Sequence, residues 1–172
     1  MSSGPKWVIG VDPDAVKSGI GIYKNGSLDS LAMWSFVELL EVLRSFSEKS
    51  DLILVVEDVE SIRPTFKRQK TSQAAMQKIS QNVGQVKQAA RHIREVAEHE
   101  GVTVVMQRPL TGWLKKAKED ASLFNKLTGW TGRSNADTRD AAMLGLHYIR
   151  GQHGDGAGFD GDKKTKKELH KK

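Results

Sequence analysis

The stretch Trp7-Val8-Ile9-Gly10-Val11-Asp12 is the most informative part of the chain for its architecture. A short apolar run of this kind predicts a buried β-strand, and this one ends in a carboxylate. A second apolar run follows at residues 19–23, and the Asn25-Gly26 pair after it is typical of a tight hairpin turn. With a third strand at 28–34, the first part of the chain predicts a three-stranded antiparallel meander.

The remainder of the chain predicts helices alternating with strands. Apolar periodicity indicates a helix from Phe36 to Phe46, and the β-branched run at 52–56 is typical of a strand covered on both faces. Further along we expect a long helix within 72–100, a strand at 102–106, one or two short helices between 111 and 127, and a last helix at 136–149. This order predicts an α/β fold with a mixed five-stranded sheet, the antiparallel meander plus parallel strands, flanked by helices on both faces.

Composition narrows the protein class. The chain has 172 residues, of which 38% are hydrophobic, enough for one domain with a real core. It has no cysteine, which excludes disulfides, thiolate zinc sites, iron–sulfur clusters and cysteine nucleophiles. No apolar run approaches the roughly 20 residues that span a bilayer, and the first residues lack a long apolar stretch of the secretory type. We therefore expect a cytoplasmic protein, associated with the nucleoid or, if phage-encoded, in the host cytoplasm.

The positive charge is concentrated at the carboxyl end. The net charge is +6, and residues 163–172 carry +5 of it through six lysines and one glutamate. Residues 151–162 are rich in glycine and predict a linker. We expect a folded domain over 1–150 and a linker with a lysine-rich, disordered tail over 151–172. The alternative for the tail is an arm that binds DNA phosphates without sequence preference.

Carboxylates occur at the ends of two predicted strands and at the start of the last helix. Asp12 ends the first strand and Glu57 ends the fourth, and parallel strands place such residues at the same edge of a sheet. Asp137 and Asp140 stand three residues apart, on one face of the last helix. Each acid alone has a plainer explanation, as a turn residue or a helix N-terminal charge. Those explanations do not account for two buried strands that both end in acids.

A convergence of four carboxylates favours bound cations, since the charges otherwise repel one another. Oxygen ligands, with no cysteine and no suitably spaced pair of histidines, favour Mg²⁺ or Mn²⁺ over Zn²⁺. Two such ions can promote in-line attack at a phosphodiester. The spacing of the acids alone does not name an enzyme.

Three blocks of sequence resemble one known family. They are V-I-G-V-D-P at 8–13 followed by S-G-I-G-I at 18–22, L-V-V-E-D-V at 54–59, and A-D-T-R-D-A-A at 136–142. In this order they resemble the RuvC family of Holliday junction resolvases, within the RNase H-like (retroviral integrase) superfamily. The resemblance spans residues 7–150 and implies an RNase H-like fold. The chain's divergence from typical cellular members points to a phage or other mobile-element origin.

The resemblance also implies a site and a reaction. Asp12, Glu57, Asp137 and Asp140 match the family's catalytic, metal-binding tetrad, which would hold two Mg²⁺ or Mn²⁺ ions per active site. The implied reaction is hydrolysis of two symmetry-related phosphodiesters at a four-way DNA junction, in recombination, repair or phage DNA processing. A homodimer would perform it, with the dimer contact in the long helix within 72–100, since a two-fold dimer fits a pseudo-two-fold substrate.

Departures from the family's pattern affect the DNA-contacting residues. Asp14 replaces a glycine, and Glu60 stands where the family carries an aromatic residue that is thought to enter the junction. The segment 63–70 after it combines four cations with one aromatic residue, a composition suited to phosphates and an unpaired base, or else to an ordinary mobile surface loop. The DNA-contacting residues we expect are Arg63, Phe66, Lys67, Arg68, Lys70, Arg108, Lys115 and Lys116.

The sequence is also compatible with other functions. The same chemistry would serve a nuclease for flaps, forks or RNA-containing duplexes, and the altered segment after Glu60 keeps that alternative in view. A non-catalytic protein that binds branched DNA is a second alternative, which does not explain four acids facing DNA. An ATP-binding protein of similar topology would need a longer chain for its two lobes.

Overall fold

The computed structural model describes residues 4–61 and 72–152 of the chain. Within these residues, five strands form one sheet in the order β3-β2-β1-β4-β5. The strands are β1 (Trp7–Asp12), β2 (Ser18–Lys24), β3 (Ser27–Trp34), β4 (Leu52–Glu57) and β5 (Thr103–Gln107). The pairs β1–β2 and β2–β3 are antiparallel, whereas β1–β4 and β4–β5 are parallel. The mixed sheet predicted from the sequence is thereby confirmed.

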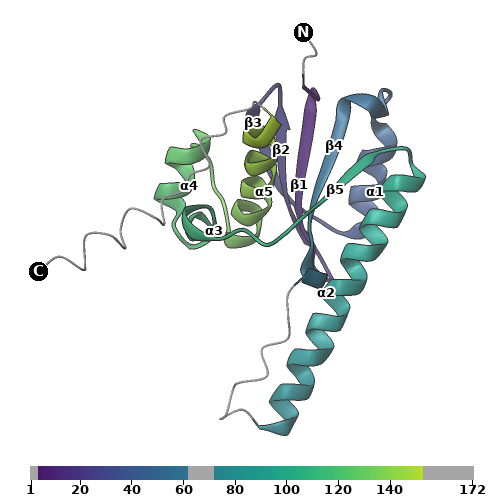
Figure 1. The fold of residues 1–172 in the computed structure, drawn as a ribbon, viewed down its shortest axis with the longest axis vertical. Helices are drawn as coiled ribbons and strands as arrows, with labels where there is room; N and C mark the ends of the chain where they lie inside the picture. Colours follow the sequence, from purple (N-terminus) through teal and green to yellow (C-terminus); the bar gives the residue numbers. More distant parts are fainter. Residues whose placement is uncertain (1–3, 62–71, 153–172) are drawn as a thin grey trace, which may run out of the picture.

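Helices cover both faces of this sheet (Figure 1). Helices α1 (Phe36–Ser45) and α2 (Gln73–His99) pack on one face, and α3 (Gly112–Glu119), α4 (Ala121–Thr128) and α5 (Ala136–Gln152) pack on the other. Two short 3₁₀ helices, η1 (Lys49–Asp51) and η2 (Val59–Ser61), precede and follow β4. Within 4–61 and 72–152, none of the helices combines the length and the apolar character that a bilayer crossing requires.

The two apolar cores follow from the alternation of side chains along the strands. Ile9 and Val11 point to the face covered by α1 and α2, where both are fully buried. Val8 and Tyr23 point to the opposite face and pack with the α5 residues Ala142 and Leu144. The hydroxyl of Tyr23 donates a hydrogen bond to the Ala142 carbonyl at 2.8 Å. The central strands are therefore covered on both sides, as their continuous apolar sequences predict.

Glycines on β1 and β2 let α5 lie directly against the sheet. A Cβ atom at Gly10 would stand 1.9 Å from the Ala141 carbonyl oxygen, and one at Gly21 would stand 2.5 Å from the Ala142 Cα. A Cβ at Gly19 would stand 2.3 Å from the Asp137 carbonyl oxygen. Only glycine fits at such a close approach of two backbones. The first turn of α5 is thus held beside the carboxyl end of β1.

The last helix begins where the sequence predicts and extends further. The side chain of Asn135 accepts a hydrogen bond from the Thr138 amide at 2.8 Å, and the Thr138 hydroxyl accepts one from the Asn135 amide at 3.0 Å. This reciprocal cap satisfies amides that the first turn leaves free. The helix ends at Gln152 rather than near 149, and the predicted linker and tail beyond it lie outside the described residues.

Helix α2 is much longer than the face of the sheet that it covers. Its carboxyl-terminal half buries Ala90, Ile93 and Ala97 against the core. Its amino-terminal half extends past the sheet (Figure 1), and Met76 and Ile79 there are each 44% exposed. Ser72 caps the protruding end by accepting a hydrogen bond from the Ala75 amide at 3.3 Å. This helix therefore carries exposed apolar side chains that its own domain does not cover.

Candidate active site

Three carboxylates meet at the edge of the sheet where the parallel strands end. Asp12 is the last residue of β1 and Glu57 the last of β4, and the pairing of Val11 with Val56 places the two acids side by side. Asp140, in the second turn of α5, faces them and is only 8% exposed. One oxygen from each of the three carboxylates lies within 4.8 Å of the others. We refer to Asp12, Glu57 and Asp140 as the acid cluster.

The fourth acid of the predicted tetrad stands at the margin of this cluster. Asp137 lies in the first turn of α5 and is exposed. Its charge nevertheless contributes to raising the pKa of Asp12, so its carboxylate is within electrostatic range. The structure thus gathers three of the four predicted acids closely and leaves Asp137 one helical turn before Asp140.

A lysine that the sequence analysis did not single out enters the acid cluster. The Lys118 ammonium, from α3, donates a hydrogen bond to Asp140 Oδ2 at 2.9 Å and lies 3.7 Å from Asp12 Oδ2. Burial opposes its charge, but the hydrogen bond to Asp140 and the charge of Asp12 raise the pKa of Lys118 above its usual 10.5. Lys118 is therefore a firmly charged counter-ion to these carboxylates.

One lysine does not balance the charge of this cluster. Burial raises the pKa of the Asp12 carboxyl from 3.8 to about 7; Lys118 opposes the shift, and the charges of Asp140 and Glu57 add to it. Burial, followed by the charge of Asp140, also raises the pKa of Glu57, against the effect of Lys118 and Lys115. The surroundings thus disfavour full ionisation of the acids, and a bound cation would reverse that preference.

The donor set fits a hard divalent cation. Carboxylate oxygens are the ligands that Mg²⁺ and Mn²⁺ prefer. Oxygens on opposite sides of one octahedral Mg²⁺ lie about 4.2 Å apart, so oxygens already within 4.8 Å need only a small adjustment to share an ion. Asp12, Glu57 and Asp140 could therefore hold such an ion, and Asp137 lies exposed one helical turn before Asp140.

Helix α3, which carries Lys118, also carries two further lysines and an exposed tryptophan. The positive charge of Lys115 favours the ionised form of the Glu57 carboxylate. Lys115 precedes Lys118 by three residues and therefore lies on the same side of the helix. Lys116 points elsewhere, with its ammonium 4.8 Å from the centre of the Trp113 ring. Trp113 is 50% exposed, which leaves its indole accessible beside these cations. The Lys115 side of α3 thus adds positive charge next to the acids, whereas Trp113 lies with Lys116 on another side of the helix.

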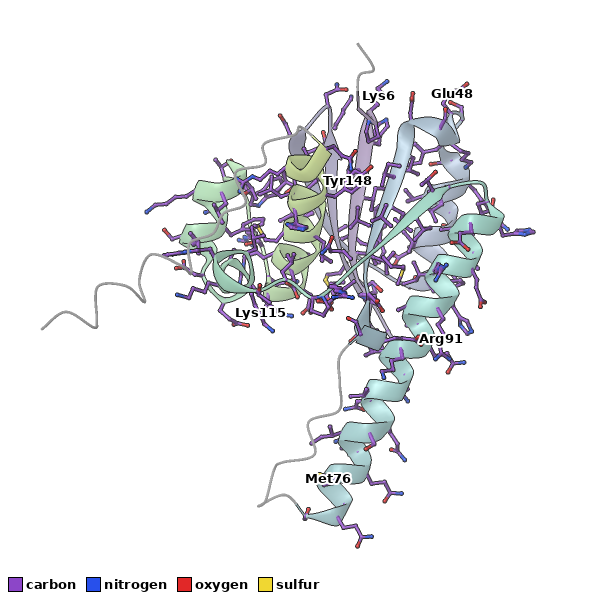
Figure 2. All side chains as sticks on the ribbon, viewed as in Figure 1. Lys6, Glu48, Met76, Arg91, Lys115 and Tyr148 are labelled. Carbon is purple, nitrogen blue, oxygen red and sulfur yellow. The ribbon has the colours of Figure 1, made fainter. Side chains whose placement is uncertain are left out.

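The remaining predicted DNA contacts divide into two groups. Arg108 is exposed and follows β5 directly, at the sheet edge that also carries Glu57, because Glu57 pairs with Gln107. Figure 2 shows Lys115 on α3 and Arg91 on α2, on opposite sides of the sheet. The contacts predicted in the basic segment after η2 lie outside the described residues: Arg63, Phe66, Lys67, Arg68 and Lys70.

Glu60 has a structural partner. Its carboxylate in η2 pairs with the Arg91 guanidinium on α2. The Asp58 carboxylate accepts a hydrogen bond from the Glu60 amide at 3.2 Å, which closes the turn after β4. The acid that replaces the expected aromatic residue therefore ties the end of β4 to α2, and it offers no ring to a DNA base.

Lys118 is the residue that sequence reasoning missed as part of the site. The spacing of Lys115 and Lys118 is compatible with one shared helix face, but α3 is short and the sequence does not say which face meets the acids. The orientation is fixed by tertiary contacts. Ala117 is fully buried, and the Arg139 guanidinium on α5 donates a hydrogen bond to the Lys118 carbonyl at 2.7 Å.

Comparison with solved structures identifies the fold. The chain superposes on RuvC of Thermus thermophilus in complex with a Holliday junction substrate, with a TM-score of 0.55 and 20% identity over 86% of this chain and 96% of that one. A second structure of Thermus thermophilus RuvC gives a TM-score of 0.51 and 19% identity over the same shares. No protein-family model and no curated protein matches the sequence. The expected RuvC-like, RNase H-like fold is confirmed.

Proposed function

We propose that this protein is a divalent-metal-dependent endonuclease that resolves four-way DNA junctions. The single observation that carries the proposal is the acid cluster: three carboxylates meet at the edge of a RuvC-like sheet, beside a basic helix. A buried group of like charges is costly unless cations are bound. Two Mg²⁺ or Mn²⁺ ions, held by Asp12, Glu57, Asp140 and Asp137, are the proposed occupants.

The residues of the chain have separate tasks in this proposal. Bound divalent ions would supply hydroxide as the nucleophile and stabilise the leaving oxygen of the phosphodiester. Asp12 and Glu57, fixed at the ends of paired strands, and Asp140 on α5 would hold those ions. Lys115 and Arg108 would attract the DNA phosphates toward the acids.

Resolution of a junction needs two incisions, and the shape of α2 supports a two-fold dimer that supplies two sites. Met76, Ile79 and Val83 follow the spacing of a coiled-coil seam and are 44%, 44% and 48% exposed. The same stripe continues into Val86, Ala90 and Ile93, which pack on the domain's own core. A second copy of the chain is the proposed occupant of the exposed half.

The test is cleavage of labelled DNA substrates with and without Mg²⁺. A synthetic four-way junction, a flap and a linear duplex would be incubated with the wild-type protein, with Asp12→Asn and with Asp29→Asn. Asp29 is an exposed acid on β3 and serves as the matched control. Paired nicks confined to the junction, dependent on Mg²⁺ and lost only in Asp12→Asn, are the expected result. Tight binding without any cleavage in Mg²⁺ or Mn²⁺ would overturn the enzyme and leave a branched-DNA-binding protein.

A nuclease for flaps, forks or RNA-containing duplexes is the second candidate. The observation in its favour is Glu60, which pairs with Arg91 and presents no ring to the centre of a junction. The chemistry at the acids would be unchanged and only the shape of the substrate would differ. Cleavage of the flap at a rate comparable to the junction would establish this alternative.

A further inference from the structure

We propose that Lys118 is a built-in, displaceable counter-ion of the acid cluster, which takes the place of a metal ion in the metal-free protein and competes with metal binding. This inference rests on the proposed function for the identity of the metal site. It concerns a residue that the tetrad does not include. Its evidence is the geometry of α3 and α5 around the three carboxylates.

The Lys118 ammonium lies against two of the proposed metal ligands. Its Nζ is 2.9 Å from Asp140 Oδ2 and 3.7 Å from Asp12 Oδ2. The side chains of Asp12 and Asp140 are only 15% and 11% exposed, so water screens their mutual repulsion poorly. The lysine supplies the positive charge that keeps these two carboxylates together in the absence of a metal.

The backbone of Lys118 is fixed by a hydrogen bond, while its side chain is partly exposed and can move toward solvent. Arg139 donates to the Lys118 carbonyl at 2.7 Å and also to the carbonyl and hydroxyl of Ser134, at 3.2 and 3.1 Å. Ala117 next to it is fully buried. The Lys118 side chain itself is 30% exposed, and its aliphatic stem is flexible. The ammonium can therefore leave the carboxylates without any movement of α3.

A metal ion and the ammonium would compete for the same oxygens. A divalent ion bound between Asp12 and Asp140 and an ammonium within hydrogen-bonding distance of Asp140 would repel each other at close range. Binding of one therefore weakens binding of the other, by the same factor in both directions. Once displaced, the ammonium remains on the α3 side that carries Lys115, where a DNA phosphate is the complementary partner.

The consequence is an opposite effect of two substitutions on metal affinity. Lys118→Met keeps most of the length of the side chain and removes its charge, so Mn²⁺ should bind about tenfold more tightly, the factor expected from loss of one competing charged hydrogen bond. Lys118→Arg keeps the charge and can donate two hydrogen bonds to one carboxylate, so this variant should bind Mn²⁺ more weakly than the wild-type protein does. Lys116→Met, on the same helix but stacked on Trp113, should leave the affinity unchanged.

The experiment is calorimetric titration of the full-length protein with Mn²⁺ in the absence of DNA, together with thermal unfolding in chelator and in saturating Mn²⁺. In chelator, Lys118→Met is expected to have a lower melting temperature than wild type. Saturating Mn²⁺ is expected to raise the melting temperature of Lys118→Met by more than it raises that of wild type. Unchanged or weaker Mn²⁺ binding by Lys118→Met would overturn the inference, as would tighter binding by Lys118→Arg. The Lys118→Arg measurement decides the question if Lys118→Met does not fold. Failure of the wild-type protein to bind Mn²⁺ would instead contradict the proposed function.

Discussion

The carboxyl of Asp12 sits in surroundings that oppose its ionisation. Burial raises its pKa from 3.8 to about 7, so between these pH values the folded chain holds a proton that the unfolded chain has released. Stability therefore falls as pH rises through this window and levels off above it. The difference between the two pKa values corresponds to about 4 kcal/mol as an upper bound.

We predict that the metal-free protein is more stable at pH 5 than at pH 8, and that Asp12→Asn removes most of this difference. Asparagine keeps the size of the side chain and has no charge to lose or gain. The measurement is urea unfolding in chelator at both pH values. An equal pH dependence in wild type and Asp12→Asn would show that Asp12 is not the group responsible.

At the scale of single residues, the sequence predicts which acids belong to the site better than it predicts which lysine does. Asp12 and Glu57 end apolar strands, and strand polarity alone brings them to one edge, where the structure indeed has them. Lys118 belongs to a short helix whose orientation depends on Arg139 and on the buried Ala117. Neither contact has a local signal in the sequence. The sequence therefore does not show which lysine of α3 lies against the acids.

Among the elements, the close packing of α5 on the sheet depends on the glycines of β1 and β2, which have no side chain on the face that α5 covers. A methyl group at Gly10 would meet the Ala141 carbonyl oxygen at 1.9 Å, a distance that only a shift of the helix or the strand can relieve. That shift would also move Asp140 away from Asp12. The glycines therefore determine both the packing of α5 and the closure of the acid cluster.

We predict that Gly10→Ala lowers the free energy of unfolding by about 3 kcal/mol, the upper part of the range for overpacked cores. Gly84→Ala is the matched control, because Gly84 lies within α2 and a Cβ atom there would have no neighbouring atom within 4 Å. The control should be neutral or more stable by about 0.5–1 kcal/mol. Denaturant unfolding measures both. A Gly10→Ala protein as stable as wild type would contradict the close packing of α5.

Element types follow from periodicity in this chain, whereas some boundaries do not. The strands and the four predicted helical regions are present, and the segment 111–127 resolves into α3 and α4. The 3₁₀ helices around β4 were not predicted. In η2, the side chain and carbonyl of Asp58 organise the turn through hydrogen bonds to Glu60 and Ser61. Such turns depend on single side-chain bonds rather than on a repeating pattern.

For the whole molecule, the exposed half of α2 is the feature that a single domain leaves unexplained. Its apolar stripe at Met76, Ile79 and Val83 has the heptad spacing of a helix pair. Lys78, Gln81 and Gln85 lie on the opposite side of the helix and are exposed. A partner helix that covers the stripe would remove this apolar surface from water and bring two sites into one two-fold assembly.

We predict that the protein is a dimer in solution and that Ile79→Glu with Val83→Glu weakens dimerisation at least about a hundredfold, since two charges would be buried without partners. Gln81→Glu with Gln85→Glu adds the same charge to the opposite face and should leave the dimer intact. Sedimentation velocity across a concentration series measures both. A wild-type monomer at every concentration, or equal dissociation in both double variants, would contradict this interface.

The acid cluster is the feature on which the proposed activity of the whole molecule depends, and one rate comparison decides whether it is the active site. The cleavage rate of a labelled four-way junction is measured at saturating Mg²⁺ for wild type and Asp140→Asn, with junction binding measured in parallel. We predict a loss of at least about a thousandfold in rate, because a metal at these oxygens contributes several kcal/mol to phosphodiester hydrolysis, with junction binding retained. A rate within about tenfold of wild type, a difference of only about 1.4 kcal/mol, would contradict the assignment of these carboxylates as the active site.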